Sequence, residues 1–291
     1  MKSLLITGAS GFIGKNLTEA FRGRYELIIP GRFELDLGNM TIAKEYLMRH
    51  EADVLIHCAN SSDTNHHIAP KKNFISENLR MFFALDSLRQ YYGKMIYFGS
   101  GAEYGQLHYI PQMNEDYFGC HIPETDDVYG LAKYVMGKYS ELSHGVINLR
   151  LFGIFGKYEM WSRRFISNTI CKALKGIPII IDQNKLFDYM WAADLAPIVE
   201  WFIENEPKHN QYNVCTGNRI DLLTIARIVC NVVGIPQNIE VKSENGTEYS
   251  GDNSRLVSEL GNVKFTDMKT AINELTRYYE SCINEFDENQ L

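Results

Sequence analysis

The sequence predicts an α/β fold in which a doubly wound parallel sheet is followed by a smaller, mixed α/β lobe. Short apolar runs alternate with stretches of helical periodicity through the first half of the chain, and this alternation is typical of a parallel sheet covered by helices on both faces. A glycine-rich segment at residues 7–14 joins the first apolar run to the first helical stretch, which is where such sheets bind nucleotides. After Gly156 the chain changes to helices joined by segments rich in Gly, Asn and Asp.

The expected elements alternate between strand and helix through the first half. We expect strands at residues 3–7, 25–29, 54–58, 94–98, 145–151 and, later, 211–214. Helical periodicity covers residues 13–21, 40–50, 74–92 and 129–142, and then 164–174, 195–203, 222–233 and 268–283. A polar stretch at 106–127 contains two prolines, and a loop this long in a compact domain is usually functional or disordered. We place the boundary within 153–162, so that residues 1–155 form the first domain and 156–291 a lobe with some elements returning to the first.

The composition argues against several classes of partner. A net charge of -7 and a pI near 5.7 disfavour nucleic acid, which is normally bound by a basic surface. The six cysteines show no CxxC or metal-like spacing, so we expect reduced, mostly buried thiols and no metal site. The apolar run at the N-terminus is shorter than the ~7 residues of a secretory signal, and no run approaches the ~18 of a membrane helix. These features predict a cytoplasmic, soluble protein.

The glycine-rich segment TGASGFIG has the spacing and position of a dinucleotide-binding loop. Gly8 permits a tight turn, Gly11 lets the backbone approach a pyrophosphate, and Gly14 allows the helix to pack closely on the strand. The spacing G-x-x-G-x-x-G differs from the G-x-G-x-x-G fingerprint, so the argument is one of geometry. We expect Ser10, Phe12 and Ile13 of the same loop to contact the cofactor as well. The alternative is a strand-to-helix turn with no ligand.

The end of the second strand bears on the choice between NAD and NADP. There the chain reads IIPGR, with Arg32 and no adjacent acid. A guanidinium can pair bidentately with a 2′-phosphate, whereas an acid would bind the free 2′-hydroxyl. Arg32 therefore favours NADP(H) over NAD(H), unless it is an ordinary solvated charge.

A tyrosine and a lysine lie four positions apart in the segment VYGLAK. On a helix, Tyr129 and Lys133 share a face. A nearby ammonium lowers the pKa of a phenol from its usual value of about 10, so Tyr129 could exchange a proton with a hydroxyl or ketone near neutral pH. The same spacing also occurs on ordinary solvated helix faces.

Several segments now resemble one family. They are the glycine loop, YFGSGAEYG at 97–105, the Tyr129/Lys133 pair, VLIHCA at 54–59, Asn78, NLRLFGIFG at 148–156, FDYMWAADLA at 187–196 and YNV at 212–214. Together they resemble the extended short-chain dehydrogenase/reductases that act on nucleotide sugars, over nearly the whole chain. The resemblance implies a Rossmann domain at 1–155 and a nucleotide-sugar substrate lobe at 156–291.

The resemblance also implies roles for single residues. Tyr129 becomes the catalytic acid/base, Lys133 its partner and a ligand of the nicotinamide ribose, Ser100 the residue that polarises the substrate oxygen, and Asn78 a supporting residue. A hydroxyl donor facing the nicotinamide would stabilise charge developing on a carbonyl oxygen. The alternative for Ser100 is a turn or helix-capping serine.

Two more positions are matched to cofactor contacts. Asp36 matches an adenine-contacting aspartate, with a turn or N-cap role as the alternative. Ala59, at the end of the VLIHCA match, is expected beside the cofactor.

Departures from the family pattern narrow the reaction. The family's 4,6-dehydratases carry an aspartate and a glutamate where this chain has Gly101 and Ala102, and neither residue can move a proton. GDP-fucose-forming epimerase/reductases use a cysteine at the position of Ala102. Elimination is thus disfavoured despite Glu103 one position further on. Reduction of a keto sugar and 4-epimerisation remain.

We expect an NADPH-dependent reductase of a nucleotide-linked 4-keto-6-deoxysugar, because of Arg32 and the short chain. An NDP-sugar 4-epimerase with tightly held NAD is the alternative, and an inactive dinucleotide-binding scaffold is the remote one. Two diphosphate-contacting arginines of the family are absent, at Phe187 and in the segment 247–252. Four basic residues could supply the missing positive charge: Lys157, Arg163, Arg164 and Lys185. The alternative is that each is an ordinary surface residue. A homodimer is expected through helices 74–92 and 129–142, with Phe82, Phe83, Leu85 and Leu88 shared between core and interface.

Overall fold

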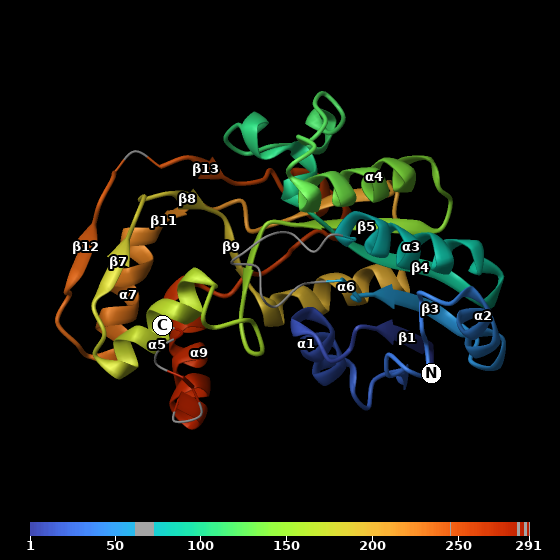
Figure 1. Ribbon diagram of the computed structural model, residues 1–291, viewed down its shortest axis with the longest axis horizontal. Coiled ribbons are helices and arrows are strands. Elements are labelled where there is room, and N and C mark those ends of the chain that lie inside the picture. Colours follow the sequence, from blue (N-terminus) through green and yellow to red (C-terminus); the bar gives the residue numbers. More distant parts are fainter. Residues whose placement is uncertain (62–72, 245, 284–285, 288–289, 291) are drawn as a thin grey trace.

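The computed structural model describes residues 1–61, 73–244, 246–283, 286–287 and 290. A six-stranded sheet with the order β10-β5-β4-β3-β1-β2 forms its centre (Figure 1), and every neighbouring pair in it is parallel. Its strands are β1 (Ser3–Thr7), β2 (Glu26–Ile28), β3 (Ala52–His57), β4 (Tyr92–Ser100), β5 (Val146–Leu151) and β10 (Gln211–Val214). The predicted doubly wound α/β class is confirmed.

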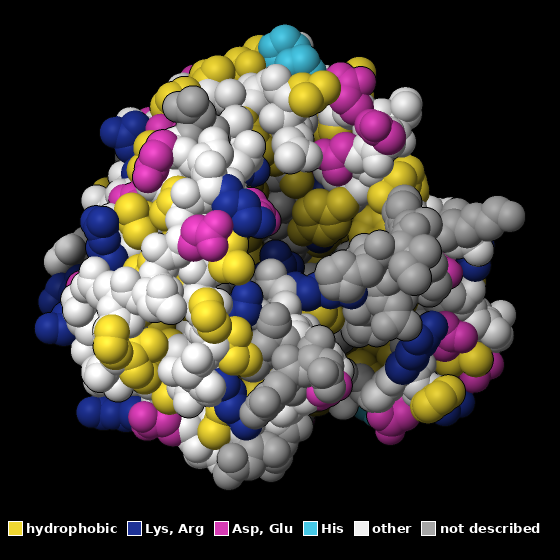
Figure 2. Space-filling model, turned by 60° about the vertical axis from the view of Figure 1, so that its left-hand side comes forward, with side chains coloured by type: hydrophobic (Ala, Val, Ile, Leu, Met, Phe, Trp, Pro, Cys, Tyr) yellow, Lys and Arg dark blue, Asp and Glu magenta, His cyan; other side chains and the backbone are white. Residues whose placement is uncertain are grey.

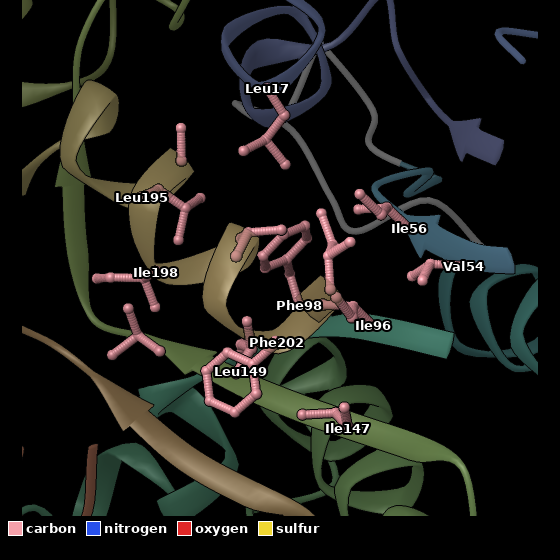
Figure 3. Packing of buried hydrophobic residues seen from close by; sticks show 14 of the residues in the cluster. Leu17, Val54, Ile56, Ile96, Phe98, Ile147, Leu149, Leu195, Ile198 and Phe202 are labelled. Atoms are coloured by element: carbon pink, nitrogen blue, oxygen red, sulfur yellow. The ribbon is translucent and has the colours of Figure 1, made fainter. Parts of the chain in front are cut away.

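Helices cover both faces of this sheet. Successive strand residues point to opposite faces, so Leu4 and Ile6 of β1 enter one core and Leu5 the other. The first core is closed by α1 (Phe12–Phe21) and α6 (Leu195–Glu204), and Figure 3 shows Leu17 and Phe202 from these helices beside strand residues such as Ile96. The second core is closed by α2 (Met40–Arg49), α3 (Phe74–Ser87) and α4 (Val128–Leu142).

The helix expected over residues 74–92 is wrong at its end. Helix α3 stops at Ser87, a 3₁₀ turn follows at Arg89–Tyr91, and β4 already begins at Tyr92. The phenol of Tyr92 donates to the carbonyl of Leu85 at 2.9 Å, which holds the chain as it reverses. An added Cβ at Gly93 would lie 2.5 Å from the Asp53 carbonyl oxygen, so the strands pack closely there.

The second lobe lies at the left of Figure 1 and has its own core. Among the described residues, three small sheets, β11-β8-β13, β12-β7 and β6-β9, combine there with three helices. The strands are β6 (Gly153–Phe155), β7 (Ile179–Ile181), β8 (Leu186–Phe187), β9 (Tyr189–Trp191), β11 (Ile220–Asp221), β12 (Ile239–Val241) and β13 (Glu248–Tyr249). The helices are α5 (Phe165–Lys175), α7 (Leu222–Val233) and α9 (Met268–Cys282). From this half of the sequence, β10, α6 and α8 (Ser254–Leu260) pack with the central sheet, α8 through the fully buried Leu256. A division at residue 155 stays a prediction.

The polar stretch at 106–127 is an ordered segment with 3₁₀ turns at Gln106–His108 and Glu115–Tyr117. The side chain of Met113 is fully buried. Its backbone N–H donates to Ser250 at 3.2 Å, and its carbonyl accepts from Asp252 at 2.8 Å. This segment therefore joins the end of β4 to the second lobe.

Among the described residues, no helix is both long and apolar enough to cross a membrane. The cysteines are free thiols, three of them buried, two partly buried and Cys120 exposed.

Candidate active site

The carboxyl ends of β1, β3 and β4 meet at one edge of the sheet. Thr7 and His57 are register partners there, and the Thr7 hydroxyl lies 2.8 Å from Nδ1 of His57. The backbone N–H of Ala59 donates to the same hydroxyl at 3.3 Å. Burial, with a smaller contribution from the nearby Lys133 charge, lowers the pKa of His57 to about 3, so this imidazole is neutral and structural at physiological pH.

The glycine loop forms the tight turn that its spacing predicts. Gly8 has φ +67, and a Cβ there would lie 2.5 Å from the backbone nitrogen of Ala59. The N–H of Gly11 donates to the Gly8 carbonyl at 2.9 Å. A Cβ on Gly14 would lie 2.3 Å from that carbonyl oxygen, so α1 starts directly on the turn. A helix N-terminus without a side-chain cap, as here at Gly11, presents free N–H groups to an anion.

The other predicted cofactor contacts lie around this turn. Ser10 is exposed, and Phe12 and Ile13 are partly buried at the start of α1. Arg32 is exposed after β2, and no ion pair with a described acidic side chain holds it. Asp36 accepts from the N–H of Gly38 at 2.8 Å, which is the turn role; the N-cap of α2 is Asn39, so the N-cap alternative for Asp36 is wrong.

Ser100 lies where β4 turns into a 3₁₀ helix (Gly101–Tyr104), and the turn fixes its hydroxyl. Its oxygen accepts from the Ala102 N–H at 3.2 Å, while its own N–H donates to Glu103 at 3.0 Å. This reciprocal pair is a capping box. The capping alternative for Ser100 is confirmed, and because the oxygen only accepts in this role, the hydroxyl proton stays free to donate.

Tyr129 lies in the first turn of α4, beside this serine. Asp127 caps the helix by accepting from the Gly130 N–H at 2.8 Å. A Cβ on Gly130 would lie 2.9 Å from the Ala102 carbonyl oxygen, so the helix rests on the turn after Ser100. The Tyr129 phenol lies close enough to the Ser100 hydroxyl for that hydroxyl to lower the pKa of the phenol. The two residues expected to handle the substrate oxygen are thus adjacent.

The expectation that Lys133 lowers the pKa of Tyr129 is wrong for this structure. Residue Tyr129 is 40% exposed, yet burial raises the pKa of its phenol, and the neighbouring charges of Glu103 and Asp127 add to this. Ser100 and the guanidinium of Arg164 act in the opposite direction.

The ammonium of Lys133 is instead directed into the protein. Its Nζ donates to the carbonyl of Phe98 at 2.7 Å and lies 5.9 Å from the Tyr129 ring centroid. Burial lowers the pKa of Lys133 to about 8, against the opposing effect of Glu103.

Asn78 is buried in α3 but contacts backbone. Its Nδ2 donates to the Phe74 carbonyl, and its Oδ1 accepts from the Ser61 N–H, each at 2.9 Å. The Phe74 ring lies 6.1 Å from the ring of Tyr129. Asn78 thus fixes the segments beside the tyrosine, and among the described residues it makes no hydrogen bond with Ser100 or Tyr129.

Glu103 is committed to a buried ion pair. Its Oε2 accepts from Nε of Arg150 at 2.7 Å, and both side chains are 0% exposed. Asn148 also donates to it. A carboxylate held this way cannot serve as a mobile proton carrier, which supports the exclusion of elimination chemistry.

Tyr249 of the second lobe lies beside the turn that carries Ser100, with other aromatic rings packed against it, and sequence reasoning missed it. The phenol of Tyr249 lies near enough to the Ser100 hydroxyl for that hydroxyl to lower its pKa against the effect of burial. Its ring lies 5.2 Å from that of Phe152 and 6.0 Å from that of Phe187. An added Cβ on Gly101 would lie 2.4 Å from the Tyr249 oxygen. The only signal in the sequence is that Tyr249 lies in the segment that departs from the family pattern. Figure 2 shows one face of the molecule hollowed, with hydrophobic and basic side chains in the hollow.

The match to a family model decides the classification. Residues 4–215 match the model described as the NAD dependent epimerase/dehydratase family. The chain belongs to this family. The match runs from β1 to the residue after β10 and so includes the whole central sheet.

Individual relatives are distant but cover nearly the whole chain. GDP-L-colitose synthase of Yersinia pseudotuberculosis is 23% identical over 303 residues, covering 95% of this chain and 97% of that protein. The structure of GDP-mannoheptose C4 reductase from Campylobacter jejuni with NADP bound has a TM-score of 0.81 at 21% identity, covering 96% and 98%. UDP-glucose 4-epimerase of Thermotoga maritima has a TM-score of 0.83 at 17% identity, covering 96% and 99%. At such identities the structures establish the shared fold.

Proposed function

We propose that this protein is an NADPH-dependent reductase of a nucleotide-linked 4-keto-6-deoxysugar. The observation that carries the proposal is the pairing of Ser100 with Tyr129 at the end of β4, with no group at positions 101–103 free to move a second proton. Gly101 and Ala102 have no acid, and Glu103 is held by Arg150. Such a site supports proton transfer at one oxygen, as carbonyl reduction requires.

The structure fits a nicotinamide dinucleotide. The cradle formed by Gly8, Gly11 and Gly14 has no room for a Cβ at Gly8 or Gly14, and its free N–H groups suit a pyrophosphate. Arg32, exposed and without a described acid beside it, would take the 2′-phosphate of NADP(H). Among the relatives, a C4 reductase has been solved with NADP bound, which supports this choice. When bound, the dinucleotide supplies the hydride.

The protein residues handle the oxygen that becomes the alcohol. Ser100 donates a hydrogen bond to the carbonyl oxygen and stabilises the charge that develops there. Tyr129 donates its proton to that oxygen as it becomes alkoxide. Its raised pKa keeps it protonated at neutral pH, which suits an acid. Lys133 would hold the nicotinamide ribose, the other role that the resemblance implies for it, while one of its three protons is donated to the Phe98 carbonyl.

Arg164 is the basic residue that we assign to the substrate diphosphate. It precedes α5, its side chain is exposed, and its charge acts on both Tyr129 and Tyr189. It therefore lies on the same side as the reacting oxygen, and its guanidinium can pair with phosphate oxygens. Lys157, Arg163 and Lys185 show no such effect on Tyr129.

A 4-epimerase remains the second candidate, because two structural neighbours have that name and one of them was solved with NAD. The two reactions differ in whether NADPH is consumed. A reductase consumes one NADPH for each sugar, while an epimerase regenerates its NAD and shows no net consumption.

The test is a direct assay of NADPH oxidation with keto sugars generated by a 4,6-dehydratase. Cofactor-free protein that oxidises NADPH in step with sugar reduction supports the reductase. Protein that converts one sugar epimer to the other with no net NADPH change, and retains NAD through purification, supports the epimerase. Activity of wild type that is lost in Tyr129→Phe would exclude the inactive scaffold.

We also propose a homodimer through α3 and α4. Of the four apolar residues expected to be shared, Phe82, Leu85 and Leu88 are buried in this chain's own core, and only Phe83 is exposed, at 36%. Leu142 at the end of α4 is 88% exposed and adds to the apolar surface available. Analytical ultracentrifugation of wild type and Phe83→Glu would test it.

A further inference from the structure

Tyr249 brings a phenol from the second lobe to the catalytic serine, and its backbone is fixed there. Strand β13, which ends at Tyr249, pairs with β8 so that Tyr249 and Phe187 are partners. The carbonyl of Tyr249 accepts from the Asp188 N–H at 3.1 Å. Asp188 itself is fully buried and accepts from the N–H groups of Thr216 and Gly217 at 2.9 and 2.7 Å. The strand end therefore has little freedom to move away.

The ring of Tyr249 is confined by three aromatic neighbours from separate segments. The ring centroids of Tyr109, Phe152 and Phe187 lie 4.9, 5.2 and 6.0 Å from its own. Gly101 leaves the space that the phenol fills, since a Cβ there would come within 2.4 Å of the Tyr249 oxygen. The position at which dehydratases of the resembled family carry an acid is thus occupied by a phenol from elsewhere in the chain.

The number of hydrogen bonds that Ser100 can make determines how the neighbouring Tyr249 phenol affects it. A serine hydroxyl has one proton to donate and two lone pairs that accept. The Ala102 N–H fills one lone pair at 3.2 Å. Burial raises the pKa of Tyr249 well above its ordinary value, so its phenol stays protonated and can donate to the other. The proton of Ser100 is then left for Tyr129 or for a substrate oxygen.

We propose that Tyr249 is a positioning residue, which donates to the Ser100 oxygen and thereby directs the serine proton toward the reacting oxygen. The effect on turnover rests on the proposed function, whereas the effect on Tyr129 does not. A substrate oxygen placed between Ser100 and Tyr129 then meets two donors, and the second lobe completes the site that the first half of the chain begins.

The first test is a double-mutant cycle in turnover. Tyr249→Phe keeps the ring packing and removes one hydroxyl, so kcat should fall about tenfold, the loss expected from one hydrogen bond of about 1.4 kcal/mol, while KM and NADPH affinity change less than about twofold. In a Ser100→Ala background the same change should alter kcat less than about twofold, because the group through which it acts is gone. Tyr109→Phe is the matched control, since it removes a hydroxyl from a ring that packs on Tyr249, and it should leave kcat unchanged. Equal losses from Tyr249→Phe with and without Ser100 would overturn the proposal.

The second test needs no substrate. Tyrosine labelled with ¹³C at Cζ reports the pKa of Tyr129 by NMR, with Tyr129→Phe assigning the signal. The charged groups facing this phenol are Glu103, Asp127 and Arg164, with Lys133 nearby, and all of them remain in the variants.

Tyr249→Phe should raise the pKa of Tyr129 by a few tenths of a unit, because Ser100 becomes a weaker donor when it loses a polarising partner. The shift should vanish in the Ser100→Ala background. An unchanged Tyr129 pKa in Tyr249→Phe would refute the positioning role. The two proposals can fail separately. If wild type reduces no keto sugar but the Tyr129 pKa still depends on Tyr249 through Ser100, the proposed reaction is refuted and the positioning role is retained.

Discussion

The buried pair of Glu103 and Arg150 gives the sharpest prediction of stability. Glu103→Gln keeps the shape of the side chain and removes its charge, which leaves the Arg150 guanidinium inside the protein without a carboxylate. Both side chains are 0% exposed, and Nε of Arg150 lies 2.7 Å from Oε2 of Glu103. The other hydrogen-bond partners of Arg150 are neutral, since Tyr104 and Asn213 accept from it at 3.2 and 3.4 Å and Gln211 accepts as well. The carboxylate of Glu115 acts on Arg150 through its charge, with no hydrogen bond between them.

Removing one partner of such a pair costs about 3–5 kcal/mol, because an uncompensated charge stays buried. With a urea m-value of roughly 3 kcal/mol/M, the unfolding midpoint should fall by about 1 M or more. The assay is urea unfolding followed by the fluorescence of Trp161, Trp191 and Trp201. The double variant Glu103→Gln/Arg150→Met should lose less than the sum of the two single variants, since it leaves no unpaired charge.

The matched control is Asp182→Asn, which breaks the exposed pair with Lys242 and should leave the midpoint unchanged. A loss below about 1 kcal/mol for Glu103→Gln would refute the reasoning. It would mean that solvent reaches the pair, or that Glu103 is free to act in the site.

Three further predictions concern the site and its surroundings. Tyr129→Phe should lower kcat by about 10²–10⁴ with NADPH affinity unchanged in a fluorescence titration, and equal loss of cofactor binding would contradict its role as acid. Arg164→Gln should raise KM for the nucleotide sugar about tenfold, because one charge-assisted contact is lost, whereas Arg163→Gln should not. Equal effects of the two substitutions would refute the assignment of Arg164 to the substrate diphosphate. His57 is neutral in the folded protein, with a pKa of about 3 against 6.5 when unfolded. Its contribution to the free energy of unfolding is therefore complete above pH 6.5 and is lost as the pH falls from 6.5 toward 3, by up to about 1.4 kcal/mol per pH unit. The free energy of unfolding in urea, plotted against pH over this range, should have a steeper slope in wild type than in His57→Asn.

The features that the sequence predicted correctly are the local ones. The central strands follow from short apolar runs, and the turn at Gly8–Gly14 follows from residues whose missing side chains the turn requires. Tyr129 and Lys133 share a helix because their spacing is helical. In each case the interacting residues are close in the sequence, so periodicity and spacing carry the information.

The features that it missed depend on contacts between distant segments. Lys133 donates to the Phe98 carbonyl, and helical spacing says nothing about that backbone atom on a neighbouring strand. The sequence alone leaves Glu103 as a candidate acid, because its ion pair with Arg150 forms across to the adjacent strand β5. Tyr249 reaches Ser100 only through the pairing of β13 with β8, which no local pattern specifies.

The most direct measurement follows a deuterium label from NADPH to the sugar. The enzyme is incubated with NADPH deuterated at C4 of the nicotinamide and a dehydratase-generated nucleotide 4-keto-6-deoxysugar, and the product is analysed by mass spectrometry. We predict transfer of one deuterium to C4 of the sugar for each NADPH consumed, from one face of the cofactor only, and loss of this transfer in Tyr129→Phe. Product sugar without deuterium, or interconversion of sugar epimers with no net consumption of NADPH, would contradict the assignment as a reductase.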